Sequence, residues 1–173
     1  MTTTIKNNLQ IITLGCKVNQ AESEAIAAGI LQKTGWDLSK SRKKANLCII
    51  NTCAVTQKAA MQSRQAIRRA IKDNPDAVIA VTGCYAQNDP GAITGIKGVD
   101  YVIGQGKKHH LIEIIKSSEK SSTEKNYLPV KPPSPVVCHN DISNNRHFDP
   151  MPAPSACGMR TRPFIKIQDG CNS

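Results

Sequence analysis

The stretch of sequence that decides the fold is Ala77-Val78-Ile79-Ala80-Val81-Thr82-Gly83-Cys84. Its first five residues carry no polar side chain, which is typical of a parallel strand buried on both faces of a sheet. Two similar runs precede it: Leu9 to Leu14, which leads to Cys16, and Leu47 to Ile50, which leads to Cys53. The sequence therefore predicts three buried strands, each followed closely by a cysteine.

Helical patterns alternate with these strands. Residues 21–33 place apolar side chains at helical spacing and end at Gly35, and residues 56–72 do the same before the breaker pair Asn74-Pro75. A weaker unit follows, with a strand at 101–103 and a helix at 107–118. This alternation predicts an α/β fold, an open parallel sheet with flanking helices of the flavodoxin-like kind.

The composition changes after residue 116. Residues 117–125 are rich in serine and charge, and eight of the ten prolines lie between Pro129 and Pro163, so we expect no core there. We predict an α/β domain at 1–118, a proline- and serine-rich linker or tail at 119–159, and the beginning of a further domain at 160–173, where a new strand starts.

Length and composition limit the class of protein. The 173 residues suffice for one domain with a buried core and a tail. The N-terminus lacks a signal-peptide pattern and no apolar run reaches about 18 residues, so we expect a cytoplasmic protein without a membrane span. Seven cysteines in such a chain argue against a disulfide framework and favour metal ligation or free thiols.

Three of the cysteines are expected to meet at one edge of the sheet. Cys16, Cys53 and Cys84 each follow a strand and precede a helix, and open α/β sheets bind ligands beyond the carboxyl ends of their strands. The helix N-termini should lower the pKa of these thiols, and glycines at 15 and 83 would admit a bulky centre. Three thiolates suit an iron–sulfur cluster with one open iron better than a closed zinc site, which needs four ligands. The alternative is three unrelated buried cysteines.

The other cysteines and histidines suggest no site. Cys48 lies inside an apolar run and is interpreted as a small buried hydrophobe. Cys138 and Cys157 lie in the proline-rich segment without partner spacing and are taken as incidental. Residues 107–110, two lysines followed by two histidines, are interpreted as a solvated first turn of the fourth helix.

The formal charge of +10 is concentrated in one region. Residues 33–72 contain one acidic residue, Asp37, and ten basic ones. The basic residues are Lys33, Lys40, Arg42, Lys43, Lys44, Lys58, Arg64, Arg68, Arg69 and Lys72. Such a concentration indicates an anionic partner, the alternative being a solvated helix face with a basic loop. Arg64, Arg68 and Lys72 recur at steps of four and would align on one helix face to grip nucleic-acid phosphates. Aromatic residues, at 3%, are too few for base stacking.

The residues around the three cysteines form three distinctive sequence motifs. They read Thr-Leu-Gly-Cys-Lys-Val-Asn-Gln-Ala-Glu-Ser at 13–23, Asn-Thr-Cys-Ala-Val-Thr at 51–56 and Thr-Gly-Cys-Tyr-Ala-Gln at 82–87. Together they resemble the N-terminal domain of the radical S-adenosylmethionine methylthiotransferases. The wording at 16–20 most resembles the branch that modifies threonylcarbamoyladenosine in tRNA. The resemblance covers residues 9–116 and again 160–173.

This resemblance implies roles for four cysteines. Cys16, Cys53 and Cys84 would hold an auxiliary 4Fe-4S cluster, and Cys171 would be the first cysteine of the C-x-x-x-C-x-x-C loop of a second cluster. In the family that second cluster cleaves S-adenosylmethionine, and the hypermodified adenosine next to the anticodon of tRNA becomes methylthiolated. The implied cofactors are the 4Fe-4S cluster and, in a full-length enzyme only, S-adenosylmethionine; the implied partner is tRNA.

The sequence departs from the family after Cys171. The other two cysteines of the loop, the barrel and the C-terminal RNA-binding domain have no counterpart before Ser173. One thiolate cannot hold the radical-generating cluster, so we expect the chain alone not to complete the reaction. A truncated chain is expected, the leading piece of a longer or interrupted enzyme, with a separately encoded or frameshifted radical-SAM remainder as a candidate partner. Two alternatives stay open: a stand-alone iron–sulfur or sulfur-carrier module, and a basic tRNA-binding module.

Overall fold

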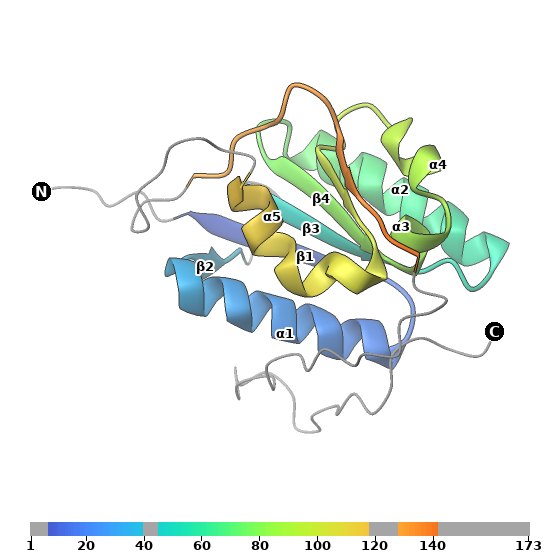
Figure 1. Cartoon of the computed structure of the whole chain (residues 1–173), viewed down its shortest axis with the longest axis horizontal. Coiled ribbons are helices and arrows are strands. Elements are labelled where there is room, and N and C mark those ends of the chain that lie inside the picture. Colours follow the sequence, from blue (N-terminus) through green and yellow to red (C-terminus); the bar gives the residue numbers. More distant parts are fainter. Residues whose placement is uncertain (1–6, 40–44, 118–127, 142–173) are drawn as a thin grey trace, which may run out of the picture.

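One sheet of parallel strands organises the molecule. The computed structural model describes residues 7–39, 45–117 and 128–141. Within these residues six strands pair in the order β2-β1-β3-β4-β5-β6, every neighbour parallel (Figure 1). The strands are β1 (Asn8–Thr13), β2 (Asp37–Leu38), β3 (Leu47–Thr52), β4 (Val78–Gly83), β5 (Tyr101–Ile103) and β6 (Val136–Cys138).

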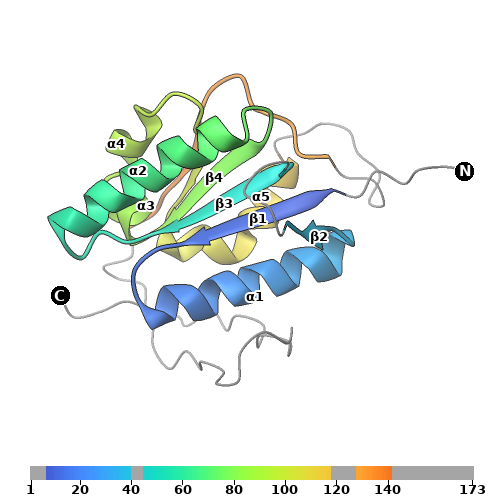
Figure 2. The same cartoon turned by 180° about the vertical axis from the view of Figure 1, so that it is seen from behind.

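Helices cover both faces of this sheet. On one face lie α1 (Lys17–Thr34) and α5 (Leu111–Ser117), the latter preceded by the 3₁₀ helix η1 (Gln105–His110). On the other face lie α2 (Gln57–Asp73), α3 (Cys84–Asn88) and α4 (Pro90–Thr94), as Figures 1 and 2 show from opposite sides. The predicted α/β fold, an open parallel sheet with flanking helices, is confirmed.

The sheet is buried from both sides because its central strands are apolar on both. Every residue of β3 and β4 is buried. Alternate residues face opposite layers: Ile49 packs toward α1 and α5, whereas Ile50 packs toward α2. Each such isoleucine contributes about 1.5–3 kcal/mol relative to an exposed one. These two core layers fix the register of the strands and hence the edge at which they end.

The ends of α1 and α2 agree with the predicted bounds to within one residue, except at the start of α1. Helix α1 begins at Lys17, four residues before the predicted start, and Cys16 is its N-cap. It ends at Gly35, which takes the left-handed conformation (φ 67°) and donates its N–H to Leu31 O at 2.9 Å. Helix α2 begins after Thr56, whose hydroxyl accepts from the N–H of Ala59 at 3.1 Å.

The proline-rich segment contains a strand that the sequence analysis missed. The expectation that residues 129–163 contribute no core is wrong at β6, which extends the sheet beyond β5. Val136 and Cys138 pack against the core, so Cys138 is not incidental to the fold. Three residues suffice because β5 already presents a formed edge, and no proline falls inside the strand. Residues 142–173, which include Cys157, Cys171 and the predicted start of a second domain, lie outside the described residues.

The fourth helical segment also differs from the prediction. Residues 105–110 form a 3₁₀ helix, and the α-helix starts only at Leu111. The interpretation of residues 107–110 as a solvated turn is wrong for Lys108, which is buried at 2% exposure. Its ammonium group is turned inward by a buried carboxylate on α1, described below.

Candidate metal centre

Cys16, Cys53 and Cys84 lie at the carboxyl ends of three neighbouring strands. They follow β1, β3 and β4, which are adjacent in the sheet and run in the same direction. Cys16 is exposed, Cys84 is partly buried and Cys53 is buried, and all three are free cysteines. The edge therefore presents three thiols from loops 31 to 37 residues apart in sequence, two of them with access to solvent.

Two glycines let the loops of this edge approach one another. Gly15 has a φ of 92°, and a Cβ there would lie 2.6 Å from the Cβ and 2.8 Å from the Sγ of Cys53. Gly83 has a φ of 96°, and its Cβ would lie 2.3 Å from the carbonyl oxygen of Thr52. The sequence suggested that these glycines make room for a bulky centre, whereas in the structure they make room for the chain itself.

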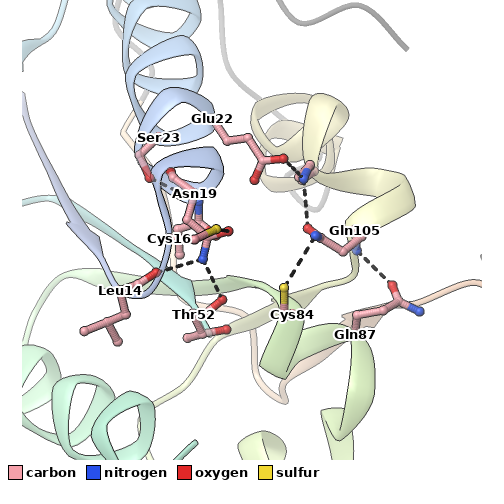
Figure 3. Close-up of polar contacts among 11 residues, drawn as sticks. Leu14, Cys16, Asn19, Glu22, Ser23, Thr52, Cys84, Gln87 and Gln105 are labelled. Carbon is pink, nitrogen blue, oxygen red and sulfur yellow. Dashed lines mark hydrogen bonds and ion pairs between the residues drawn. The ribbon is translucent and has the colours of Figure 1, made fainter. Parts of the chain in front are cut away.

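Two buried asparagines hold the loops together. The Nδ2 of Asn19, in the first turn of α1, donates to Leu14 O at 2.8 Å and to Thr52 O at 3.1 Å (Figure 3). The Nδ2 of Asn51 donates back to Asn19 O at 3.0 Å and to the Oγ of Ser23 at 3.1 Å. These bonds join the loop of Cys16 to that of Cys53, so the relative position of the two cysteines is fixed by side chains.

A serine on α2 fixes Cys53 from the other face of the sheet. Ser63 Oγ accepts from the N–H of Cys53 at 3.2 Å and donates to its carbonyl oxygen at 2.8 Å. Ser63 is fully buried in the middle of an otherwise apolar helix face. The loop of Cys53 therefore has no freedom to drift from the sheet edge, although it lacks regular structure.

Cys84 is contacted by a polar chain that starts on α1. The Nε2 of Gln105 lies 3.8 Å from Cys84 Sγ, and Gln105 Oε1 accepts from Lys108 Nζ at 2.9 Å (Figure 3). Lys108 Nζ also forms a short ion pair with Glu22, and both side chains are buried. Neither composition nor motif spacing identified Glu22, Gln105 or Lys108 as candidate site residues. Although Glu22 lies within the quoted motif, no spacing rule connects it to a lysine 86 residues away.

The protonation of Cys84 differs from the expectation. The pKa of its thiol is raised by burial and by the neighbouring Cys53, an effect that Lys108 opposes and that Cys16 and Glu22 reinforce. The expected lowering by a helix N-terminus is wrong here because α3 is only five residues long and burial outweighs it. Cys53 and Cys16 raise the pKa of Cys84 because thiolates at one edge repel one another.

These thiols do not form a ready-made site for a single ion. Among residues 7–39, 45–117 and 128–141, no three His, Cys, Asp or Glu side chains are grouped so that they could hold one metal ion. The donor set is nevertheless sulfur from three separate loops, which is the set that iron–sulfur clusters use.

A groove of about 670 Å³ lies away from the cysteines. It lies between β1 and α2, and its lining includes Gln10, Ile12, Gln65 and Arg69. None of the three cysteines lines it.

The three predicted phosphate-binding residues on α2 differ in environment. Arg64 is partly buried, its Nη1 donates to the hydroxyl of Tyr85 at 2.9 Å, and its guanidinium lies 5.8 Å from the centre of that ring. Arg68 and Lys72 are exposed on the same helix. Residues 40–44, which carry four of the ten basic residues, lie outside the described parts of the chain.

No helix within the described residues is both long and apolar enough to cross a membrane. The predicted absence of a membrane span is consistent with this finding.

Known proteins are similar to this chain over most of its length. It is 38% identical over 161 residues to a threonylcarbamoyladenosine tRNA methylthiotransferase of Bacillus subtilis, covering 93% of this chain and 33% of that protein. It is 37% identical over 172 residues to a protein of the same name from Rickettsia prowazekii, covering 97% and 34%. It is 33% identical over 172 residues to a ribosomal protein uS12 methylthiotransferase of Chlamydia caviae, covering 97% and 33%.

These relatives are about three times as long as the part that matches, so the chain spans about one third of their length. The model of the uncharacterized protein family UPF0004 matches residues 8–104, which include all three cysteines of the sheet edge. The chain therefore belongs to the UPF0004 family and carries the N-terminal domain of the methylthiotransferases.

Proposed function

We propose that this chain is the auxiliary-cluster domain of a tRNA methylthiotransferase that modifies the hypermodified adenosine next to the anticodon. Cys16, Cys53 and Cys84 are proposed to hold a 4Fe-4S cluster. The observation that carries the proposal is the position of three thiols at the carboxyl ends of three adjacent parallel strands, two of them accessible. The substrate follows the names of the first relatives, which act on threonylcarbamoyladenosine in tRNA.

The residues present suit such a cluster better than a single ion. In a four-iron cluster each cysteine binds a different iron, so the three sulfurs need not converge on one point. This is consistent with the absence of a one-ion site among the described side chains. When bound, the cluster would supply an iron without a protein ligand, to which the sulfur to be transferred can attach.

The chain's own contribution is to fix the ligands before iron arrives. Asn19 and Asn51 link the loop of Cys16 to that of Cys53, and Ser63 binds the backbone of Cys53 from the α2 face of the sheet. Because the Cys84 thiol has a raised pKa, cluster assembly must release its proton. Assembly is therefore expected to proceed faster at pH 8.5 than at pH 7.

The radical half of the reaction is proposed to need a further portion of protein. The chain spans about a third of its relatives, and Cys171 is the only cysteine of the second cluster loop within the 173 residues. A radical-SAM portion, on the same or a separate polypeptide, would supply S-adenosylmethionine chemistry. The 173 residues alone are proposed to bind the auxiliary cluster without completing methylthiolation.

Anaerobic reconstitution with iron and sulfide tests the proposed site. The purified chain should bind roughly four irons with a broad absorbance at about 400 nm, and Cys16→Ala, Cys53→Ala and Cys84→Ala should each abolish it. Cys138→Ala is the matched control, since Cys138 is a partly buried cysteine at the end of β6, two strands away from β4. Unchanged iron content in the triple variant would show that the ligands are misassigned.

A second candidate function, tRNA binding, is favoured by the exposed cations of α2. Arg68 and Lys72 project from the helix that also carries Ser63, so phosphates bound there would lie on the α2 face of the sheet. With few aromatic residues, binding should be electrostatic and fall steeply with salt.

Filter binding of tRNA at several salt concentrations tests this second candidate. Arg68→Ala and Lys72→Ala should each weaken binding and reduce the slope of log K against log salt by about 1. Lys107→Ala, an exposed lysine on η1 next to the opposite layer of helices, should leave the slope unchanged. Affinity that is independent of salt would exclude this role.

A further inference from the structure

A buried ion pair lies beside the cysteine edge. Glu22 of α1 and Lys108 of η1 are 1% and 2% exposed and are joined by a short contact. Buried ion pairs are weak contributors to stability, because desolvation of the two charges offsets their attraction. Another ion pair, Lys33 of α1 with Glu113 of α5, is about half exposed and lies at the end of α1 opposite to Cys16. The position of the buried pair therefore calls for a role other than stability.

The pair is the start of a chain of contacts that ends on a cysteine. Lys108 Nζ donates to Gln105 Oε1 at 2.9 Å, and Gln105 Nε2 lies 3.8 Å from Cys84 Sγ. The backbone N–H of Gln105 is itself held by Gln87 Oε1 at 2.8 Å. Figure 3 shows this sequence of groups from Glu22 to Cys84.

The lysine decides which end of the Gln105 amide meets the sulfur. An ammonium group only donates, so it must face the amide oxygen, and the amide N–H₂ is then turned toward Cys84. Glu22 keeps Lys108 in place because a buried lysine without a carboxylate would be costly. The orientation of Gln105 therefore depends on two residues that do not touch the cysteine.

We propose that Gln105 donates an N–H···S hydrogen bond to the Cys84 ligand of the cluster, and that Lys108 and Glu22 are positioning residues for this donor. The inference rests on the cluster proposed above. Hydrogen bonds to cluster sulfurs stabilise the reduced, more negative state and raise the reduction potential. The same outer contacts also retain metal, since their loss typically costs 10–100-fold in metal affinity.

The contact distinguishes Cys84 from Cys16. The thiol of Cys16 lies 4.0 Å from Asn19 Oδ1, an acceptor, so this contact gives its sulfur no donor. Gln105 therefore makes the environment of Cys84 unlike that of Cys16. In a cluster held here, Cys84 would be a weaker electron donor to its iron than Cys16 would be to its own.

Redox titration of the reconstituted chain tests the proposal. Gln105→Leu removes the donor at a partly exposed position and leaves the ion pair intact. We expect the variant to assemble the cluster, to lose iron to a chelator faster than the parent, and to have a more negative midpoint. At a fixed potential near the parent midpoint, the reduced-to-oxidised ratio should fall about tenfold, equivalent to about 59 mV for one electron. The exposed neighbour Lys107→Met is the control and should not move it.

A thermodynamic cycle tests the positioning residues. Glu22→Gln with Lys108→Met removes both charges together, so neither is left buried alone. This double variant should show the same shift as Gln105→Leu, and the triple variant should show no further shift, because all three changes disrupt one hydrogen bond. Additive shifts would mean that the ion pair acts by its field and would overturn the positioning role.

The outcomes separate this inference from the proposed function. If the parent chain assembles no cluster, the proposed function and this inference both fail. If the parent assembles the cluster but Gln105→Leu has the parent potential and the parent rate of iron loss to a chelator, only the role of Gln105 is overturned.

Discussion

The interior of the central strands and their carboxyl ends are stabilised by different interactions. In β3 and β4 the interior residues are buried and apolar, and alternate ones pack into two separate core layers. At their ends the residues Asn51, Thr52 and Thr82 are equally buried but polar. Buried apolar area and close packing stabilise the interior, whereas hydrogen bonds stabilise the ends, and each hydrogen bond requires a partner.

The difference teaches where specificity resides in this domain. Apolar residues of similar volume can replace one another in a core at modest cost. A buried asparagine cannot be replaced so easily, because its partners lose their bonds with it. The strand interior therefore decides that a sheet forms, and the strand ends decide how the cysteines are placed.

The sharpest test of this comparison is Gly83→Ala. Gly83 combines φ 96° with ψ −168°, a region open essentially to glycine alone, and the added Cβ would meet Thr52 backbone atoms at 2.3 and 2.7 Å. We expect a loss of roughly 4 kcal/mol or more in unfolding free energy, together with loss of bound iron. Urea titration followed by circular dichroism measures the first and iron analysis the second.

Gly29→Ala is the matched control for that substitution. Gly29 lies within α1, and nothing lies within 4 Å of an added Cβ. Alanine should therefore stabilise the domain by about 0.5–1 kcal/mol. Equal effects of the two changes would refute the argument from backbone contact.

The next largest effect is expected from Ile79→Ala in the interior. Ile79 is fully buried in the layer under α2 and α4. Its truncation leaves a cavity and should cost roughly 2–5 kcal/mol. Since Ile79 is the second residue of β4, five residues before Cys84, iron bound per folded chain should stay at the parent value. A fall in iron below the folded fraction would mean that interior and edge are not separable.

Asn51→Ala should affect iron retention more, and stability less, than Ile79→Ala does. It removes two hydrogen bonds, to Asn19 O and Ser23 Oγ, and should cost roughly 1–3 kcal/mol. Iron retention against a chelator should fall by more than in Ile79→Ala, although stability falls by less. The comparison fails if retention simply follows stability across the two variants.

The smallest effect concerns alkaline pH and a cysteine outside the site. Burial raises the pKa of Cys48 from 9.0 to about 12. The unfolded chain therefore loses this proton first as pH rises, so stability is complete below pH 9 and declines above it. Between pH 9 and pH 10 the loss should be about 1 kcal/mol, and Cys48→Ala should remove that part of the slope. Equal slopes for both chains would contradict this assignment.

The central elements were predictable because their patterns are strong. The apolar run of β4 and the helical spacing of α2 each reflect burial over a whole element, and the position of the three cysteines followed from the rule for parallel strands. Strand β6 was not predicted because a three-residue strand among prolines carries almost no periodicity. The two-residue strand β2 escaped for the same reason.

Parts of the candidate site could not be predicted because they depend on contacts across the fold. Glu22 and Lys108 are partners only because η1 packs beside α1, and a lysine in a basic, polar stretch looks exposed from sequence. Arg64 likewise looked equivalent to Arg68, yet Tyr85 engages it. The pKa of Cys84 required the burial of the finished edge.

The parallel sheet has a consequence for the order of folding and of the proposed cluster assembly. Paired residues of neighbouring strands are far apart along the chain: Leu9 pairs with Leu47, and Leu47 with Val78. No such pair can form by closing a tight turn, so all of them depend on long crossovers that close slowly. A zinc finger gathers its ligands from short loops, and its metal can drive folding. In the proposed cluster site the three thiols come together only once the sheet has formed, so we expect folding to precede cluster assembly and iron to be delivered to the folded edge.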